Sequence, residues 1–71
     1  MVMNQNEKVL KYIDKFGSIT TMEAFMALGV TRLSARIWDL RHEGYNIVSV
    51  QKSGTNRFGE LVNYVEYRRG L

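Results

Sequence analysis

Apolar residues in the first part of the chain recur at intervals of three and four, a spacing typical of helices. The spacing predicts a first helix over residues 4–16, whose apolar stripe is formed by Val9, Leu10, Ile13 and Phe16. Asn4 and Glu7 at its start fit a capping box, in which each side chain satisfies a backbone donor of the first turn. Gly17 is expected to end this helix.

A short strand and a second helix are predicted next. Ile19, which is β-branched and lies between two hydroxyl residues, predicts the strand. Thr20 and Glu23 fit a second capping box, which begins a short and mostly apolar helix. Gly29 supplies the left-handed residue that often follows a helix, and Val30 is expected to fold back into the core.

A third helix is predicted from Arg32 to about Glu43, separated from the second by a short turn. Thr31 is expected to cap this helix, and Gly44 to end it. Its core stripe is Leu33, Ile37 and Leu40. At about 100° per residue, the opposite side carries Ala35, Trp38, Asp39 and His42. Arg32 and Ser34 flank that exposed face, while Arg36 and Arg41 border the core stripe.

After Gly44 the apolar pattern changes to a period of two. The stretches "YNIVSVQK" and "ELVNYVEYR" alternate in this way and are rich in β-branched and aromatic residues. The intervening "SGTNRFG" contains residues typical of turns. An antiparallel hairpin therefore follows the helices, and the element order predicts an α+β fold in a single domain, 1–71.

The positive charge of the chain is concentrated in its middle. The chain has 71 residues and a net charge of +3, and residues 31–59 carry that whole excess. A localised basic surface attracts polyanions, although an ordinary solvated face has the same composition. With no Cys and a lone His42, neither a disulfide nor a zinc site is expected, and no cofactor is expected.

The second and third helices together have the form of a helix-turn-helix. In that motif the second of the two helices enters the DNA major groove and reads base edges with its N-terminal residues. The N-terminal amides of the first, near Thr20 and Thr21, are able to bind a phosphate. The small Ala35, between Arg32 and Ser34, allows close approach to base edges, and arginine suits bidentate contact with guanine.

The residues "GSITTMEAFMALGVTRLSARIWDLRHEGYNI" and "RFGELVNYVEY" resemble the winged helix-turn-helix family, and more narrowly small helix-turn-helix proteins of phages and prophages. The resemblance implies three helices with a C-terminal hairpin wing. It places the third helix (32–43) in the major groove and the wing (52–57) on the backbone or in the minor groove. The wing tip would be Lys52, Ser53, Thr55, Asn56 and Arg57.

Twelve residues are therefore candidate DNA contacts. They are Thr20, Thr21, Thr31, Arg32, Ser34, Ala35, Arg36, Trp38, Lys52, Thr55, Asn56 and Arg57. For two of them a structural role is an equal alternative: Arg36 in an ion pair with Glu23 or Asp39, and Trp38 half-buried at the helix–hairpin junction. Arg41 is expected to be structural, and Phe58 to pack at the base of the wing.

The sequence thus predicts a sequence-specific binder of double-stranded DNA, either a small phage-type transcriptional regulator or an excisionase-like architectural factor. The alternative is a winged-helix protein–protein interaction module without DNA binding. RNA binding ranks third, because few exposed aromatic side chains are expected on the hairpin. The sequence contains no nucleotide-binding loop, and an enzyme is not expected. No apolar stretch indicates a membrane span or signal peptide, so a cytoplasmic location is expected. A homodimer, or a larger phage or host protein as partner, is left open.

Overall fold

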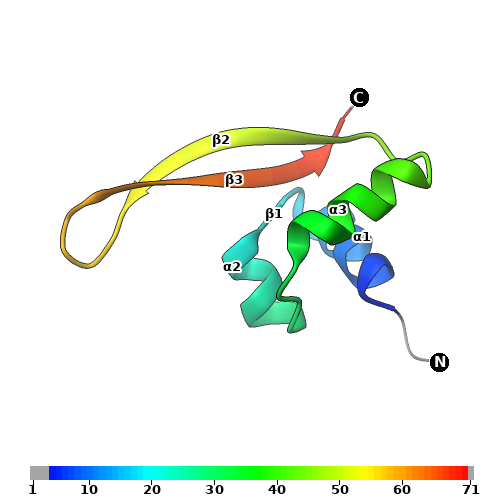
Figure 1. Ribbon diagram of the computed structural model, residues 1–71, viewed down its shortest axis with the longest axis horizontal. Helices are drawn as coiled ribbons and strands as arrows, with labels where there is room; N and C mark the ends of the chain where they lie inside the picture. Colours follow the sequence, from blue (N-terminus) through cyan, green and yellow to red (C-terminus); the bar gives the residue numbers. More distant parts are fainter. Residues whose placement is uncertain (1–3, 71) are drawn as a thin grey trace.

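The computed structural model describes residues 4–70 and contains helices and strands in the predicted order (Figure 1). The elements are α1 (Gln5–Phe16), β1 (Ile19–Thr20), α2 (Thr21–Glu23), η1 (Ala24–Leu28), α3 (Leu33–His42), β2 (Ile47–Thr55) and β3 (Leu61–Arg69). η1 is a π-helical turn that continues α2, so the two together form the second predicted helix. The fold is α+β, as predicted.

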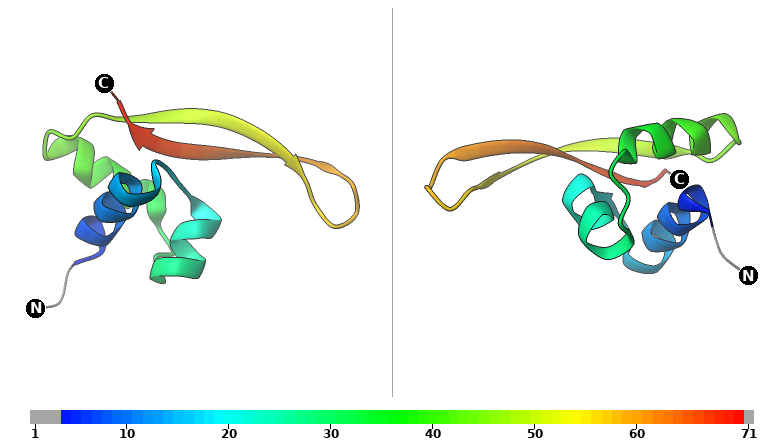
Figure 2. Two further views of the ribbon diagram at one scale, coloured as in Figure 1. Left: turned by 180° about the vertical axis from the view of Figure 1, so that it is seen from behind. Right: turned by 60° about the horizontal axis from the view of Figure 1, so that its bottom comes forward.

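The sheet is antiparallel, and β3 lies between β1 and β2. β2 and β3 pair over their whole length, whereas β1 reaches only Tyr67 and Glu66 of β3. From the Gln51–Val65 pair to the Thr55–Leu61 pair, β2 and β3 have no third strand beside them and form a two-stranded ribbon that extends away from the helices (Figures 1 and 2). This ribbon, residues 51–65, is called the wing, and the loop at its end, residues 56–60, is called the tip.

The core lies between the three helices and the base of the sheet. Its buried residues are Val9, Ile13, Ile19, Ala24, Val30, Leu33, Ile37, Leu40 and Ile47. The predicted stripe of α3 and the burial of Val30 are thereby confirmed. Phe16, predicted to belong to the α1 stripe, is instead 60% exposed and lies beside Tyr12 with a ring-centroid distance of 4.6 Å. The reason is its position in the last turn of α1, past the part of the helix that faces α3.

The predicted helix starts at Asn4 and Thr20 are confirmed. Asn4 Oδ1 accepts the Glu7 amide at 2.8 Å. At α2 the capping box is complete, because Thr20 Oγ1 accepts the Glu23 amide at 3.2 Å and the Glu23 carboxylate accepts the Thr20 amide at 2.9 Å. At α1 the Asn4 side chain alone makes a capping bond, whereas at α2 both side chains of the predicted box do so.

The start of α3 differs from the prediction. The helix begins at Leu33, and the capping position belongs to Arg32, whose side chain makes no capping bond. Gly29 has a φ of 69°, and the Val30 amide bonds back to the Ala24 carbonyl at 3.0 Å. This tight turn commits Val30 to the core and leaves Thr31 exposed, one residue too early to cap α3.

Candidate nucleic-acid interface

The exposed face of α3 carries an aromatic pair. Trp38 is 60% exposed and stacks on His42 with a ring-centroid distance of 3.6 Å. His42 Nδ1 also lies 2.9 Å from the Trp38 carbonyl. The alternative of a half-buried tryptophan at the helix–hairpin junction is therefore wrong, because Trp38 lies on open surface. Ser34 is exposed on the same helix, and Ala35 is partly buried.

Arg36 is held by neighbouring residues on the side of α3 that faces α1. It forms an ion pair with Asp39 at 3.2 Å and donates to Gln5 Oε1 at 3.3 Å. Of the two predicted partners, Asp39 is confirmed and Glu23 is wrong. Glu23 is bonded to the Thr20 amide and, at 3.4 Å, to the Tyr12 hydroxyl.

The Tyr12 contact ties α1 to α2. Desolvation raises the pKa of Tyr12, and the negative charge of Glu23 and its hydrogen bond raise it further. The hydroxyl therefore stays protonated and remains a donor to Glu23 at neutral pH.

Arg41 joins the end of α3 to the sheet. Its Nε donates to the Ile47 carbonyl at 2.9 Å, and its guanidinium donates to Ser49 Oγ at 3.0 Å. The predicted structural role of Arg41 is confirmed, because both bonds are within the protein and fix the base of β2.

Arg32 has the opposite character. It is exposed, and its side chain makes no hydrogen bond or ion pair with any residue of the described range 4–70. A positive charge at a helix N-terminus opposes the helix dipole, so local stability does not explain it. The N-terminal end of α3 lies on the side toward which the wing projects (Figures 1 and 2). Arg32 is therefore available to a ligand on that side.

The wing is longer than the turn residues in its sequence indicate. Strand pairing continues through Ser53, Gly54 and Thr55, so the loop consists of residues 56–60. Lys52, predicted to lie at the tip, is instead within β2, opposite Tyr64. Gly54 and its neighbours are compatible with a turn but adopt strand geometry here, because the two strands remain in register up to Thr55.

Lys52 also lies near an acidic residue of the neighbouring strand. The hydrogen bond from Arg68 lowers the pKa of Glu66, and the charges of Arg68 and Lys52 lower it further, while desolvation opposes this. Part of the positive charge of Lys52 is therefore compensated within the sheet.

The tip is organised by one side chain. Asn56 Oδ1 accepts the amides of Phe58 and Glu60 at 2.9 and 3.0 Å, and its Nδ2 donates to Glu60 Oε1 at 3.1 Å. Arg57 makes no side-chain bond within residues 4–70. Phe58, predicted to pack at the base of the wing, is 86% exposed. Because the loop bonds leave Phe58 at the far end of the ribbon, no core lies within its reach.

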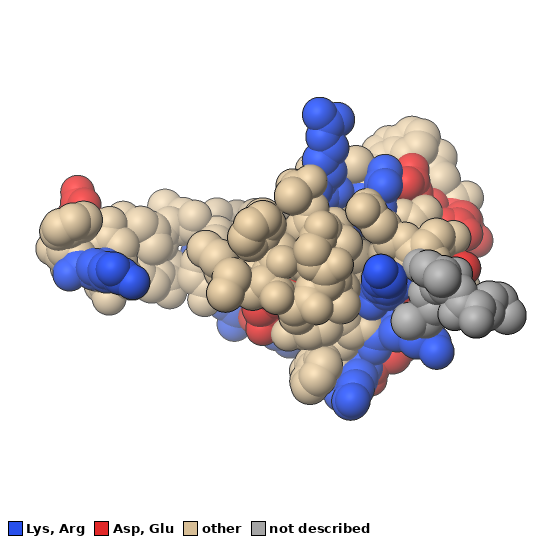
Figure 3. Space-filling model, turned by 90° about the horizontal axis from the view of Figure 1, so that it is seen from below, with Lys and Arg blue, Asp and Glu red and all other residues tan. Residues whose placement is uncertain are grey.

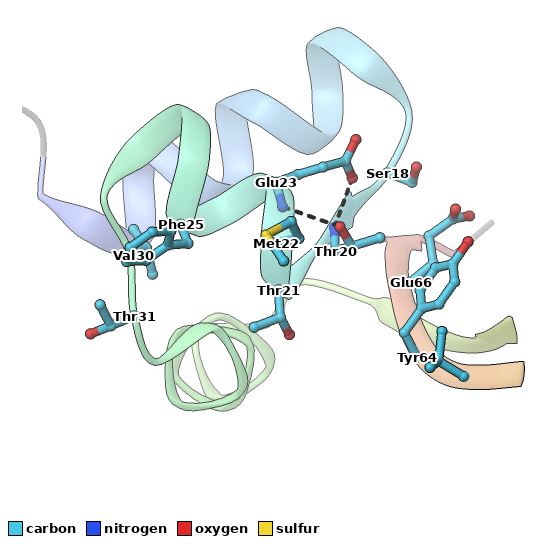
Figure 4. A pocket seen from close by; sticks show the side chains of 11 residues that line it. Ser18, Thr20, Thr21, Met22, Glu23, Phe25, Val30, Thr31, Tyr64 and Glu66 are labelled. Atoms are coloured by element: carbon cyan, nitrogen blue, oxygen red, sulfur yellow. Dashed lines mark hydrogen bonds between the residues drawn. The ribbon is translucent and has the colours of Figure 1, made fainter. Parts of the chain in front are cut away.

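A groove separates the second helix from the wing (Figure 4). Its volume is about 870 Å³. The lining residues on the helix side and in the following turn are Ser18, Thr20, Thr21, Met22, Glu23, Phe25, Val30 and Thr31, and those on β3 are Val62, Tyr64 and Glu66. The Glu23 carboxylate already occupies the start of α2, so that helix terminus carries its own anion.

Charged side chains are unevenly spread over the molecule. Seen from below, lysine and arginine atoms appear around the helices and again at the far end of the wing, with an uncharged stretch between them (Figure 3). Between Lys52 and Glu66 the only charged residues are Arg57 and Glu60. The far end of the wing thus carries one cation, Arg57, and one anion, Glu60, separated from the charges of the helical body.

The element order, the helix–turn–helix and the wing agree with the result of comparing the sequence with known families. A sequence model of the winged helix-turn-helix domain matches residues 4–68. The chain belongs to the winged helix-turn-helix domain family. Membership of this family indicates DNA binding as its general function. Neither the curated proteins nor the solved structures gave a match.

Two exposed aromatic side chains of this winged helix-turn-helix domain are not predicted by its sequence. The hairpin exposes two aromatic side chains, Phe58 at 86% and Tyr64 at 43%. The signal for Phe58 is its position next to Gly59 among turn residues. Residues 4–70 contain no cluster of metal-ligating side chains, and no helix among them is long and apolar enough to cross a membrane.

Proposed function

We propose that this winged helix-turn-helix protein binds double-stranded DNA sequence-specifically, with α3 in the major groove and the wing along the backbone toward the next minor groove. It would serve in the cytoplasm as a small phage-type transcriptional regulator or an excisionase-like architectural factor. One observation carries the proposal. Arg32 and Arg57 have no partner within residues 4–70, and they lie at the end of α3 nearest the wing and at the tip of the wing.

At the N-terminal end of α3, Arg32 in the capping position is the proposed base-reading residue. A guanidinium forms two parallel hydrogen bonds with the O6 and N7 atoms of guanine. The neighbouring Ser34 and Ala35 are small, so they allow the first turn of the helix to approach base edges. Trp38, one turn further along, would pack on sugar. Arg36 would have to release Asp39 to reach DNA, so its proposed contribution is smaller.

The other candidate DNA contacts fall into two groups: residues whose side chains are free of bonds within the protein, and residues whose side chains already make such bonds. Lys52 and Arg57 would contact phosphates, which positions the protein without reading sequence. The exposed hydroxyls of Thr21, Thr31 and Thr55 would donate to phosphates along the same path.

Two candidates have a different proposed role. The side chains of Thr20 and Asn56 are engaged in the α2 cap and the tip loop. They would therefore shape the interface rather than touch DNA.

Salt dependence tests the proposal. If Lys52 and Arg57 each neutralise one phosphate, the logarithm of duplex affinity should fall against the logarithm of salt with a slope of about −2. Arg57→Ala should flatten the slope by about 1. Lys11→Ala, which removes an exposed cation of α1, is the matched control and should leave the slope unchanged. A flat salt response of the wild type contradicts DNA binding.

A protein–protein interaction module is the second candidate, and the groove favours it. Methionine and aromatic side chains are enriched in protein interfaces, and Met22, Phe25 and Tyr64 line the groove. This function predicts a folded protein with no salt-dependent affinity for duplex DNA. The same titration therefore separates the two candidates, and sedimentation of the bound complex shows whether the protein acts as a homodimer.

A further inference from the structure

The tip and the first residue of β3 present two apolar side chains that the fold does not use. Phe58 is 86% exposed and Leu61 is 73% exposed. None of residues 51–65 is buried, so the wing has no core of its own for either side chain to join. Packing therefore does not explain why they lie at the point furthest from the helices, whereas contact with a ligand would.

The loop that carries Phe58 is fixed by hydrogen bonds. Asn56 Oδ1 accepts the Phe58 amide at 2.9 Å, and the Asn56 amide bonds to the Glu60 carbonyl at 3.0 Å. The Gly59 amide bonds to the Asn56 carbonyl at 3.1 Å, a turn that Gly59 completes with a φ of 77°. The backbone on both sides of the phenyl ring is thus ordered before binding, which reduces the entropy that a ligand contact would otherwise lose.

The reach of the wing matches the spacing of DNA grooves. Five residue pairs, from Gln51–Val65 to Thr55–Leu61, lie past the last rung shared with β1. At about 3.4 Å per residue they carry the tip about 17 Å from the three-stranded part of the sheet. A major groove and the next minor groove are half a helical turn apart, which is also about 17 Å. With the start of α3 in the major groove, a ribbon of this length is long enough to carry the tip to the adjacent minor groove.

The charges of the tip fit a minor groove. Arg57 directly precedes Phe58 and has no partner in the described chain, and arginine is drawn to the negative potential of a narrow minor groove. Glu60 is the opposing charge, and Asn56 Nδ2 donates to its carboxylate at 3.1 Å. The bond keeps this carboxylate on the Asn56 side of the loop.

We propose that Phe58 is a wedge that enters the minor groove beside Arg57 and inserts between two base pairs, with Leu61 behind it. Inserted apolar side chains unstack a base step and kink the duplex toward the major groove. The inference rests on the proposed DNA binding and deepens it, because it makes this protein one that bends its site. A phenyl ring inserts without base hydrogen bonds, so flexible steps such as TA are the preferred position.

The test measures bending and binding separately. A duplex of about three helical turns, selected by the wild-type protein from a random pool, carries fluorophores at both ends, so that bending raises energy transfer. Wild-type protein should raise it, and Phe58→Ala should lose that rise while affinity falls about 5- to 100-fold. Phe58→Leu, which retains an apolar wedge, should keep most of the bend. Glu60→Gln should tighten binding and keep the bend.

Controls separate this inference from the proposed function. Phe16→Ala removes another exposed phenylalanine, at the end of α1, and should change neither bending nor affinity. An equal bend with wild type and Phe58→Ala overturns the wedge while leaving DNA binding intact. Self-association that depends on Phe58, with no bend, shows that the tip binds a second copy and also overturns it. If wild-type protein binds no duplex at any salt concentration, the proposed function fails as well.

Discussion

α3 and the wing differ in what their side chains are used for. In α3, Leu33, Ile37 and Leu40 are buried. In the wing, residues 51–65, no residue is buried, and its order comes from the backbone ladder and the Asn56 loop. A packed helix uses its side chains to hold the fold, whereas a hydrogen-bonded ribbon leaves its side chains free. The wing is therefore the part of the molecule whose surface is least constrained by stability.

The same difference divides the arginines near α3. Arg36 is bonded to Asp39 and Gln5, and Arg41 to β2, whereas Arg32 at the start of α3 has no partner within residues 4–70. The number of arginines in or next to α3 therefore overstates how many of them are available to a ligand. In this structure, α3 presents one unpaired arginine, at the end that faces the wing.

The largest expected effect tests the contrast in packing. Ile37→Ala removes a core side chain that is 1% exposed and should lower the free energy of unfolding by about 2–5 kcal/mol. Leu61→Ala, in the exposed part of the wing, is the matched change and should stay within about 0.5 kcal/mol. Urea denaturation of both variants measures the difference. A comparable loss in Leu61→Ala would mean that the wing packs on the body in solution.

The next effect contrasts two arginines at opposite ends of α3. Arg32→Ala should weaken specific binding by about 1–3 kcal/mol and relax preference at one base position, with melting unchanged. Arg41→Ala should lower the melting temperature, because two hydrogen bonds to β2 are lost. Binding selection and thermal melting are measured on both variants. A melting temperature lowered in Arg32→Ala but not in Arg41→Ala would show that Arg32 is structural and would contradict this assignment.

A smaller effect concerns the two threonines at the start of α2. Thr20→Ala removes a capping oxygen and should destabilise the protein by about 1 kcal/mol. Thr21→Ala, one residue later, removes an exposed hydroxyl and should leave stability within about 0.5 kcal/mol while weakening duplex binding slightly. Calorimetry and binding assays on the pair show whether this terminus serves the fold, the ligand or both. Equal destabilisation by the two would contradict the division.

The body of the fold is predictable because its signals are local and repeated. The apolar stripe of α3 and the capping box of Thr20 and Glu23 depend on spacings of three and four residues, and the structure has both. The cap of α3 lies one residue later than the predicted Thr31, because Gly29 signals the turn but not its length, which the bond from Val30 to Ala24 sets.

The candidate site is less predictable than the fold. The position of Lys52 depends on the register of two strands, and turn residues such as Gly54 are also compatible with a strand. An isolated apolar residue such as Phe58 is usually placed in a core, which makes packing the natural expectation. Its place beside Gly59 among turn residues is the one local signal of its exposure, and the strand pairing sets how far it lies from the core. Likewise, the sequence offers Arg36 two acidic residues as ion-pair partners, Glu23 and Asp39, and spacing alone does not decide between them.

The smallest expected effect concerns the ion-pair partner of Arg36. The Arg36–Asp39 pair is about one-third exposed on both sides, and partly exposed ion pairs contribute about 0.2–1 kcal/mol. A double-mutant cycle with Arg36→Ala and Asp39→Ala should give a coupling free energy in that range. The cycle of Arg36→Ala with Glu23→Ala should be additive, because Glu23 is bonded to Thr20 and Tyr12. Binding selection on Arg36→Ala supplies the second readout, and base preference should persist. Lost preference with no coupling to Asp39 would mean that α3 reads DNA through Arg36, and that the free arginine at its start is not the reader.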